Sequence, residues 1–222
     1  MTATATSIPR TLPVAEPASR VVLHGISWRT YETLLHEIGE QRLFLTYDRG
    51  ELEIMAQHPY HERYKKFVGR FIEILSLELD IPIVSVGNTT FRREDLEKGL
   101  EPDECYYVQH ELQMRHKWDD IDLTKEPPPD LVVEMDYTHH AVNRENIYAA
   151  LGVPEIWRFN LNRLEVLVLG GGARYQPSSK SLAFPFLPMD EFKRFLQLAM
   201  TTPETELVKS FREWVKKNLR VR

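Results

Sequence analysis

Residues 131–159 read LVVEMDYTHHAVNRENIYAALGVPEIWRF, and this stretch decides the fold. Its first five residues are apolar except for Glu134, as in a strand buried within a sheet. The next part is typical of a helix, which Gly152 and Pro154 stop before a second apolar run. The predicted elements are a strand over residues 131–135, a helix over 142–151 and a strand over 155–159.

The strongest helix signal lies upstream, where apolar residues keep three-to-four spacing over residues 59–79. Before it, Asp48, Arg49 and Gly50 form a hairpin-type turn between two apolar runs. We further expect strands over residues 43–47, 51–55, 81–86, 105–108 and 164–169, helices over 27–39, 189–200 and 203–219, a charged connector over 92–98 and a loop over 109–129. Strands and helices in this order predict an α/β fold, a mixed sheet flanked by helices.

The composition fits one compact domain, because 42% of the 222 residues are hydrophobic and 27% are charged. We assign this domain to residues 21–200, with a flexible leader over 1–20 and a basic amphipathic helix over 201–222. No apolar run reaches the length of a membrane helix, and the leader has no apolar signal core. Cys105 is the single cysteine, so no internal disulfide forms, and we expect a cytoplasmic protein without a membrane contact.

The charge balance limits how the chain can contact nucleic acid. The 28 Lys and Arg residues are outnumbered by 33 Asp and Glu residues, which gives a net charge of -5. Any contact with phosphates must therefore be local. The most basic segment is residues 209–222, yet its apolar residues recur at helical spacing. Its basic side chains are either a nucleic-acid contact or the solvated face of a packed helix.

Two acids stand where the surrounding sequence does not favour them. Asp103 precedes one predicted strand, and Glu134 interrupts the most apolar strand. If these strands are neighbours, the two carboxylates converge at one end of the sheet, where burial without a partner is costly. Two carboxylates, together with waters and phosphate oxygens, are a common magnesium site. The alternative is structural, with Asp103 as a turn residue and Glu134 as an outward-facing edge residue.

Several sequence blocks occur in a specific order between residues 43 and 200. They are LTYDRGELEIM, HPYHERYKKFVGRFIEIL, RREDLEKGLEPDECYYV, PPPDLVVEMD and IYAALGVPEIWR. In this combination the chain resembles the Uma-type family of restriction-endonuclease-like proteins, within the PD-(D/E)XK nuclease superfamily. The resemblance implies a restriction-endonuclease-like fold, Mg²⁺- or Mn²⁺-assisted hydrolysis of DNA phosphodiester bonds and often a homodimer.

The resemblance also implies roles for individual residues. The Pro-Asp motif of the superfamily ends at Asp103 and its Glu-X-Lys motif begins at Glu134, so these two residues are the expected metal ligands. The third position departs from the pattern, because Asp136 stands where a lysine is expected. In the related family the next helix supplies a basic residue instead, and here that position is Arg144. Asp136 is then a candidate to assist a metal-bound water.

Arg144 and Glu62 each have two interpretations. Arginine stays charged at any accessible pH, so Arg144 can clamp a phosphate but cannot act as a base. It is alternatively an exposed helix residue. Glu62 matches an extra metal-adjacent acid of the superfamily, although an acid in a first helical turn also favours the helix dipole.

Other candidates carry weaker signals. His61, His139 and His140 have neither a cysteine partner nor H-x-x-x-H spacing, which argues against a zinc site. Asp130 repeats the Pro-Asp motif but precedes its strand, so we rank it below Asp103.

The leading functional hypothesis is a Mg²⁺- or Mn²⁺-dependent endonuclease acting on DNA, with Asp103, Glu134, Asp136, Arg144 and Glu62 as its site. The alternative is a catalytically weak or inactive nuclease-fold protein that binds nucleic acid or a protein partner. The direction of Arg144 separates the two hypotheses. An arginine directed into the acidic cluster favours chemistry, and one directed to solvent favours the binding module.

Overall fold

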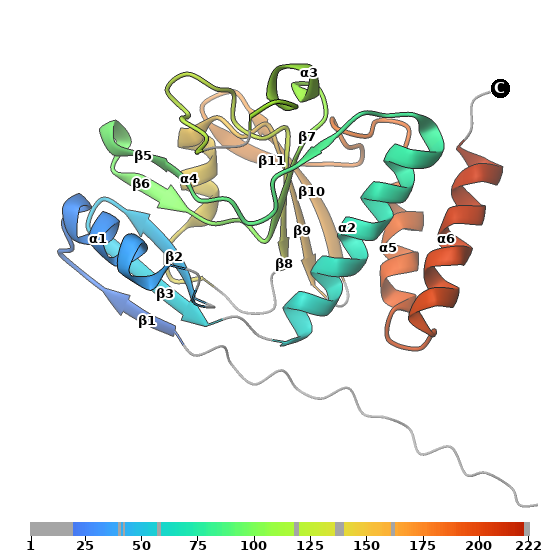
Figure 1. The fold of residues 1–222 in the computed structure, drawn as a ribbon, viewed down its shortest axis with the longest axis horizontal. Coiled ribbons are helices and arrows are strands. Elements are labelled where there is room, and N and C mark those ends of the chain that lie inside the picture. Colours follow the sequence, from blue (N-terminus) through green and yellow to red (C-terminus); the bar gives the residue numbers. More distant parts are fainter. Residues whose placement is uncertain are drawn as a thin grey trace, which may run out of the picture.

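The computed structural model describes most of the chain, and Figure 1 shows its fold. The described residues are 20–39, 41, 43–56, 59–117, 120–135, 140–160 and 163–219, with the backbone alone for 59–61. The expected leader over residues 1–20 therefore lies almost entirely outside the described residues. No helix within the described ranges is long and apolar enough to cross a membrane.

The chain alternates between strands and helices. The strands are β1 (Arg20–Leu23), β2 (Leu43–Asp48), β3 (Glu51–Ala56), β4 (Val84–Ser85), β5 (Phe91–Arg93), β6 (Lys98–Leu100), β7 (Glu104–Tyr107), β8 (Leu131–Met135), β9 (Glu155–Asn160), β10 (Arg163–Gly170) and β11 (Arg174–Ser178). The helices are α1 (Trp28–Ile38), α2 (Pro59–Leu79), α3 (Glu111–Met114), α4 (Arg144–Leu151), α5 (Met189–Leu198) and α6 (Glu204–Asn218), with a 3₁₀ turn at Glu94–Leu96.

The strands form two sheets. One has five antiparallel strands in the order β1-β3-β2-β6-β5, and the other has six strands in the order β11-β10-β9-β8-β7-β4. The larger sheet is mixed, because β8 pairs with β9 in parallel while its other pairings are antiparallel. A parallel pair needs a crossover, and α4 supplies it. The prediction of an α/β fold with a mixed sheet flanked by helices is confirmed.

Local sequence explains where α4 begins and ends and where the chain turns between β2 and β3. Asn143 caps α4, since its side chain accepts a hydrogen bond from the N–H of Asn146 at 3.1 Å. The helix ends at Gly152, whose φ of 81° is a conformation that few other residues adopt. Upstream, the β2–β3 hairpin turns through Arg49 and Gly50, both with positive φ, as a tight hairpin requires.

Helices α2, α5 and α6 cover one face of the larger sheet, and α4 lies on the other face (Figure 1). Aromatic rings join the three helices, with Phe71 of α2 stacked on Phe211 of α6 at 4.1 Å between ring centroids. Leu207, Phe211 and Val215 are all buried in the same core. The apolar face of α6 is therefore packed, and its basic side chains lie on the solvated side of a core helix.

Some predicted elements differ from the observed ones. The charged connector expected over residues 92–98 is wrong, because β5 and β6 pair there as a short hairpin. Lys98 fits in this strand because its ammonium group lies 2.6 Å from a carboxylate oxygen of Asp48. Strands β1 and β11 were not predicted, the strand over 81–86 shortens to β4, and α3 interrupts the expected loop over 109–129. Two of these short strands depend on partners distant in sequence, since β1 pairs with β3 and β4 pairs with β7.

The packing of α6 gives a stability prediction. Phe211→Ala should lower the free energy of unfolding by about 3–5 kcal/mol, because it leaves a cavity among fully buried rings. Urea unfolding followed by tryptophan fluorescence and by circular dichroism should show one shared transition. The exposed Lys209→Ala is the matched control on the same helix, with an expected change within about 0.5 kcal/mol. An unchanged midpoint for Phe211→Ala would mean that α6 is an appendage rather than part of the core.

Candidate active site

The carboxylates of Asp103 and Glu134 lie at adjoining ends of neighbouring strands. Strands β7 and β8 are antiparallel, and Glu104 pairs with Val133, so the next pair outward is Asp103 and Glu134. Both side chains alternate onto the face that α4 covers, because Cys105 and Val132 belong to the core on that face. Asp103 is 7% exposed and Glu134 is 9% exposed. The sequence expectation that their strands are neighbours is confirmed.

Asp103 is held by the backbone of the neighbouring strand. Its Oδ2 accepts a hydrogen bond from the N–H of Met135 at 2.6 Å. Burial raises the pKa of Asp103 to about 7, and the negative charge of Glu134 adds to the rise. The Met135 hydrogen bond and the positive charges of Arg144 and Lys65 oppose the rise without cancelling it. Asp103 is thus a carboxyl group that exchanges its proton near neutral pH.

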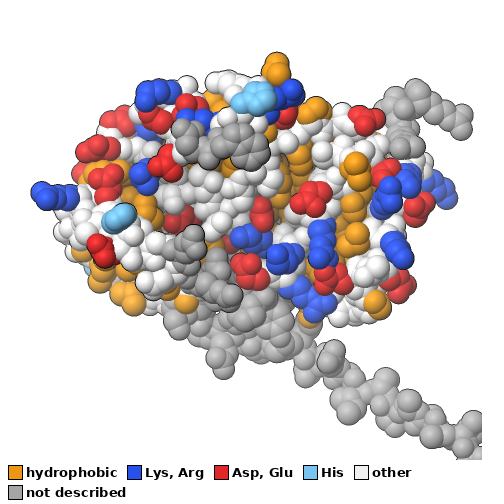
Figure 2. Space-filling model, in the orientation of Figure 1, with side chains coloured by type: hydrophobic (Ala, Val, Ile, Leu, Met, Phe, Trp, Pro, Cys, Tyr) orange, Lys and Arg blue, Asp and Glu red, His pale blue; other side chains and the backbone are white. Residues whose placement is uncertain are grey.

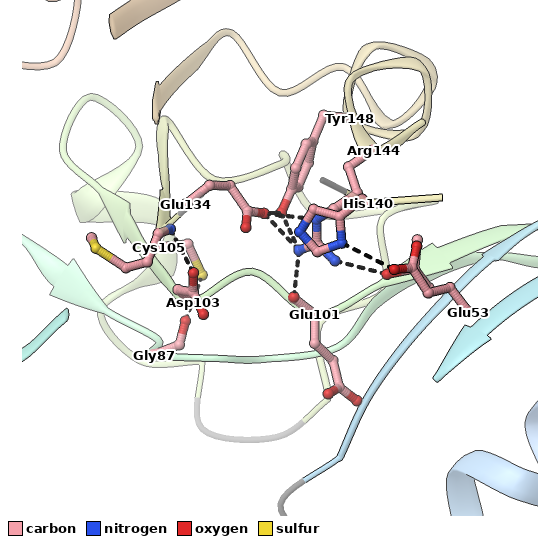
Figure 3. Close-up of polar contacts among 11 residues, drawn as sticks. Glu53, Gly87, Glu101, Asp103, Cys105, Glu134, His140, Arg144 and Tyr148 are labelled. Atoms are coloured by element: carbon pink, nitrogen blue, oxygen red, sulfur yellow. Dashed lines mark hydrogen bonds and ion pairs between the residues drawn. The ribbon is translucent and has the colours of Figure 1, made fainter. Parts of the chain in front are cut away.

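Arg144, the first residue of α4, points into this acidic pair (Figure 3). Its Nη2 and Nε donate to Oε1 of Glu134 at 2.6 and 3.2 Å. Burial acts to lower the pKa of Arg144, but the charge of Glu134, its hydrogen bond with Arg144 and the nearby Tyr148 and Asp103 together outweigh burial and raise the pKa. Arg144 is only 8% exposed, so the interpretation of it as an exposed helix residue is wrong.

The guanidinium of Arg144 also connects separate parts of the fold. Its Nη1 donates to the hydroxyl of Thr46 on β2 at 2.7 Å, and Nη2 donates to the carbonyl oxygen of Glu101 at 2.7 Å. One turn along α4, the hydroxyl of Tyr148 donates to the same oxygen of Glu134. Sequence reasoning missed Thr46 and Tyr148 as members of the site, because neither a threonine in a strand nor a tyrosine in a helix is unusual.

Glu62 occupies a different electrostatic setting. It lies in the first turn of α2, which packs on the sheet face opposite α4. Burial raises the pKa of Glu104, the positive charge of Lys65 opposes the rise and the carboxylate of Glu62 adds to it. The charge of Glu62 therefore acts on Glu104, whose side chain alternates away from Asp103 and toward α2.

The fit of a divalent cation depends on which carboxylate oxygens remain available. Among the described residues, no donor is hydrogen-bonded to Oδ1 of Asp103 or to Oε2 of Glu134. These two oxygens are ligands that Mg²⁺ accepts, with waters completing its shell. No group of three or more His, Cys, Asp or Glu side chains in the described ranges is placed to hold a metal ion. Asp136 and His139, both considered from the sequence, lie outside the described residues.

Two further acids each lie beside a histidine, Asp130 beside His110 and Glu53 beside His140. Asp130 is structural, because it accepts hydrogen bonds from the N–H groups of Val108 and His110 at 2.7 and 2.9 Å. Glu53 on β3 was missed, although it shares the signal that singled out Glu134, an acid inside an apolar strand. Its carboxylate lies 3.5 Å from the imidazole of His140.

A cavity of about 370 Å³ opens beside the acidic pair. Strands β8, β9 and β10 form one wall, and the segment leading into α4 forms the other. Its lining residues are Glu134, His140, Ala141, Val142, Asn143, Arg144, Glu145, Tyr148, Ile156, Arg158 and Leu167. The cavity gives a small polar substrate group access to Glu134 and Arg144.

The fold and site define an α/β protein with two buried carboxylates and an arginine at the end of a mixed sheet. The chain belongs to the Uma2 family, described as "Putative restriction endonuclease", whose family model matches residues 28–217. It is also similar to the crystal structure of a "putative nuclease belonging to DUF820" from Anabaena variabilis, with 12% identity and a TM-score of 0.48. That similarity covers 84% of this chain and 99% of the other. No curated protein matches the chain.

The raised pKa of Asp103 makes stability depend on pH. Below about pH 4 the carboxyl is protonated in both states, and between pH 4 and about 7 the unfolded chain releases a proton that the folded protein retains. The contribution of Asp103 to stability therefore falls as pH rises through this window. Relative to Asp103→Asn, the wild type should lose a few kcal/mol between pH 4 and 8, measured by urea unfolding at several pH values. A difference between the two proteins that does not change with pH would contradict the shift.

The buried ion pair gives a second stability prediction. Arg144→Met leaves the charge of Glu134 buried without its partner and should cost about 3–5 kcal/mol in urea unfolding. Adding Glu134→Gln to Arg144→Met should recover part of that loss, so the two substitutions are strongly non-additive. Lys125→Met is the control, since it removes an exposed ion pair and should change the stability far less. Additive losses at Arg144 and Glu134 would show that the two groups do not interact.

Proposed function

We propose that this chain is a metal-dependent endonuclease that hydrolyses phosphodiester bonds of DNA. The observation that carries the proposal is the convergence of Asp103 and Glu134 at one sheet end. Membership of a family described as "Putative restriction endonuclease" supports the same class of reaction. The proposal includes DNA as the substrate, Mg²⁺ or Mn²⁺ as the metal ion and phosphodiester hydrolysis as the activity.

Asp103 and Glu134 would hold the ion, Mg²⁺ or Mn²⁺, through the oxygen that each leaves without a donor among the described residues. When bound, such an ion polarises a phosphoryl oxygen and lowers the pKa of a coordinated water. The carboxylates of the site favour the binding of a cation. Burial and the charge of Glu134 raise the pKa of Asp103, and a nearby cation opposes both effects, so metal binding and ionisation of Asp103 would favour each other.

Arg144 takes a position near the carboxylates, where the superfamily pattern expects a lysine. Its guanidinium cannot release a proton, so its role is to hold Glu134 and to neutralise charge that develops on a phosphate. The Thr46 and Glu101 contacts fix the guanidinium before a substrate arrives. Fixed donors stabilise a transition state better than mobile ones, because they need no reorganisation during the reaction.

A DNA substrate must approach a protein whose net charge is -5. Figure 2 shows lysine and arginine side chains beside acidic ones on the face where α2 and α6 lie. Arg63 and Lys66 of α2 are exposed and can contact phosphates locally.

We also propose the homodimer that the family resemblance implies, because two sites are needed to cut both strands together. Sedimentation of the full chain tests this assembly.

The binding-module alternative has one observation in its favour. Glu134 is already neutralised by Arg144, and one of its oxygens accepts hydrogen bonds from both Arg144 and Tyr148. A protein that kept this cluster only for stability would bind DNA or a protein partner without cutting. Metal binding and cleavage distinguish the two functions.

Millimolar Mg²⁺ or Mn²⁺ should raise the melting temperature of the wild type, by about 2–4 °C for each kcal/mol of binding free energy. The same ions should support cleavage of plasmid DNA, and EDTA should abolish it. Asp103→Asn should lose both effects because it removes a ligand charge. Glu206→Gln, which neutralises an exposed carboxylate of α6, should keep both. A wild type that binds DNA yet shows neither a melting shift nor cleavage with either ion would favour the binding module.

A further inference from the structure

A third carboxylate lies close to the site and comes from the other sheet (Figure 3). Glu53 of β3 is 1% exposed, and its Oε2 accepts hydrogen bonds from the N–H groups of Ala141 and Val142 at 2.9 and 3.0 Å. Burial acts to raise the pKa of Glu53, but the adjacent His140 and these N–H groups hold it below its usual value. Glu53 is therefore a fixed, ionised carboxylate.

The other oxygen of Glu53 is directed at an imidazole. Its Oε1 lies 3.5 Å from Nδ1 of His140, and both atoms are buried. Within the described part of the chain, neither atom has a hydrogen-bond partner. Because an ionised carboxylate can only accept, this contact favours the proton on Nδ1 and leaves the lone pair on Nε2. Contacts of this kind often shorten only when a substrate binds.

His140 also reaches the candidate active site. It lines the cavity that contains Glu134 and Arg144, and 19% of its side chain is exposed. In the neutral form of the ring, the lone pair on Nε2 can accept a proton. The elements around His140 contribute these charged or titratable groups: Glu53 of β3, Glu134 of β8, Arg144, Glu145 and Tyr148 of α4, and Arg158 of β9.

The other groups around the cavity are less suited to accept a proton. Glu134 is bound by Arg144 and Tyr148, and Arg144 stays charged. Arg158 is paired with Glu145 and Glu165, at 2.6 and 2.9 Å. The cavity therefore presents one imidazole with an orienting carboxylate behind it, next to a centre that lacks the lysine of its superfamily.

We propose that His140, oriented by Glu53, accepts the proton of the attacking water in the hydrolysis. This inference rests on the proposed nuclease function. The water oxygen forms a bond to phosphorus while its proton passes to Nε2 of His140. The bond from phosphorus to the leaving oxygen breaks, and that oxygen takes a proton from solvent. His140 then returns its proton to solvent, so the net change is the addition of one water.

Chemical rescue tests the base directly. His140→Ala should lower the rate of plasmid cleavage by about 10²–10⁴-fold, the range typical of a general base. Added imidazole should restore cleavage in proportion to its concentration, whereas it should not rescue Asp103→Asn. The melting shift with Mg²⁺ should persist in His140→Ala. His36→Ala removes an exposed histidine of α1 and should cleave like the wild type.

A measurement on the metal-free protein keeps the inference testable if His140→Ala does not fold. Nitrogen chemical shifts of the wild-type His140 ring should show the tautomer with the proton on Nδ1, and Glu53→Gln should change that distribution. A proton on Nε2 would overturn the inference, as would cleavage by His140→Ala within threefold of the wild type, or a loss that imidazole does not restore. Absence of cleavage by the wild type would instead overturn the proposed nuclease function, and the role of His140 with it.

Discussion

The buried contact between Glu134 and Arg144 is the interaction on which the rest of the site depends. Glu134 lies within an apolar strand, where an unpaired charge would be prohibitive, and α4 begins with the guanidinium that compensates it. The same guanidinium bonds to Thr46 and to the backbone of Glu101. One ion pair thereby holds the end of β8, the start of α4 and the central strand β2 of the second sheet in a single arrangement.

The same ion pair determines the net charge of the site. Asp103 and Glu134 contribute two negative charges when ionised, and Arg144 contributes one positive charge. The remaining excess is one negative charge. Burial raises the pKa of Asp103 to about 7, and the charge of Glu134 adds to the rise. Under the proposed function, a divalent cation would reverse the sign of the cluster and would compete with a proton for Asp103.

The two sheets contribute unequally to this centre. The six-stranded sheet provides the acids, because the β7 and β8 ends are adjacent there. The five-stranded sheet supplies Thr46 and Glu53, which contact Arg144 and the segment entering α4. A displacement of one sheet relative to the other would therefore move the guanidinium of Arg144 and the segment that carries His140.

The sequence by itself determined the local elements and singled out two acids. Periodicity and helix-ending residues predict α2 and the β8-α4-β9 unit, and the resemblance to the Pro-Asp and Glu-X-Lys motifs implies that Asp103 and Glu134 act together. Only the tertiary structure decided where Arg144 points and that Glu53 meets His140, since Arg144 bonds to Thr46 and Glu53 lies beside His140 across long separations in the chain. The position of β6 was decided in the same way, because it pairs with the distant strand β2. Short-range patterns encode backbone conformation, whereas the partner of a buried charge is chosen by the packing of distant segments.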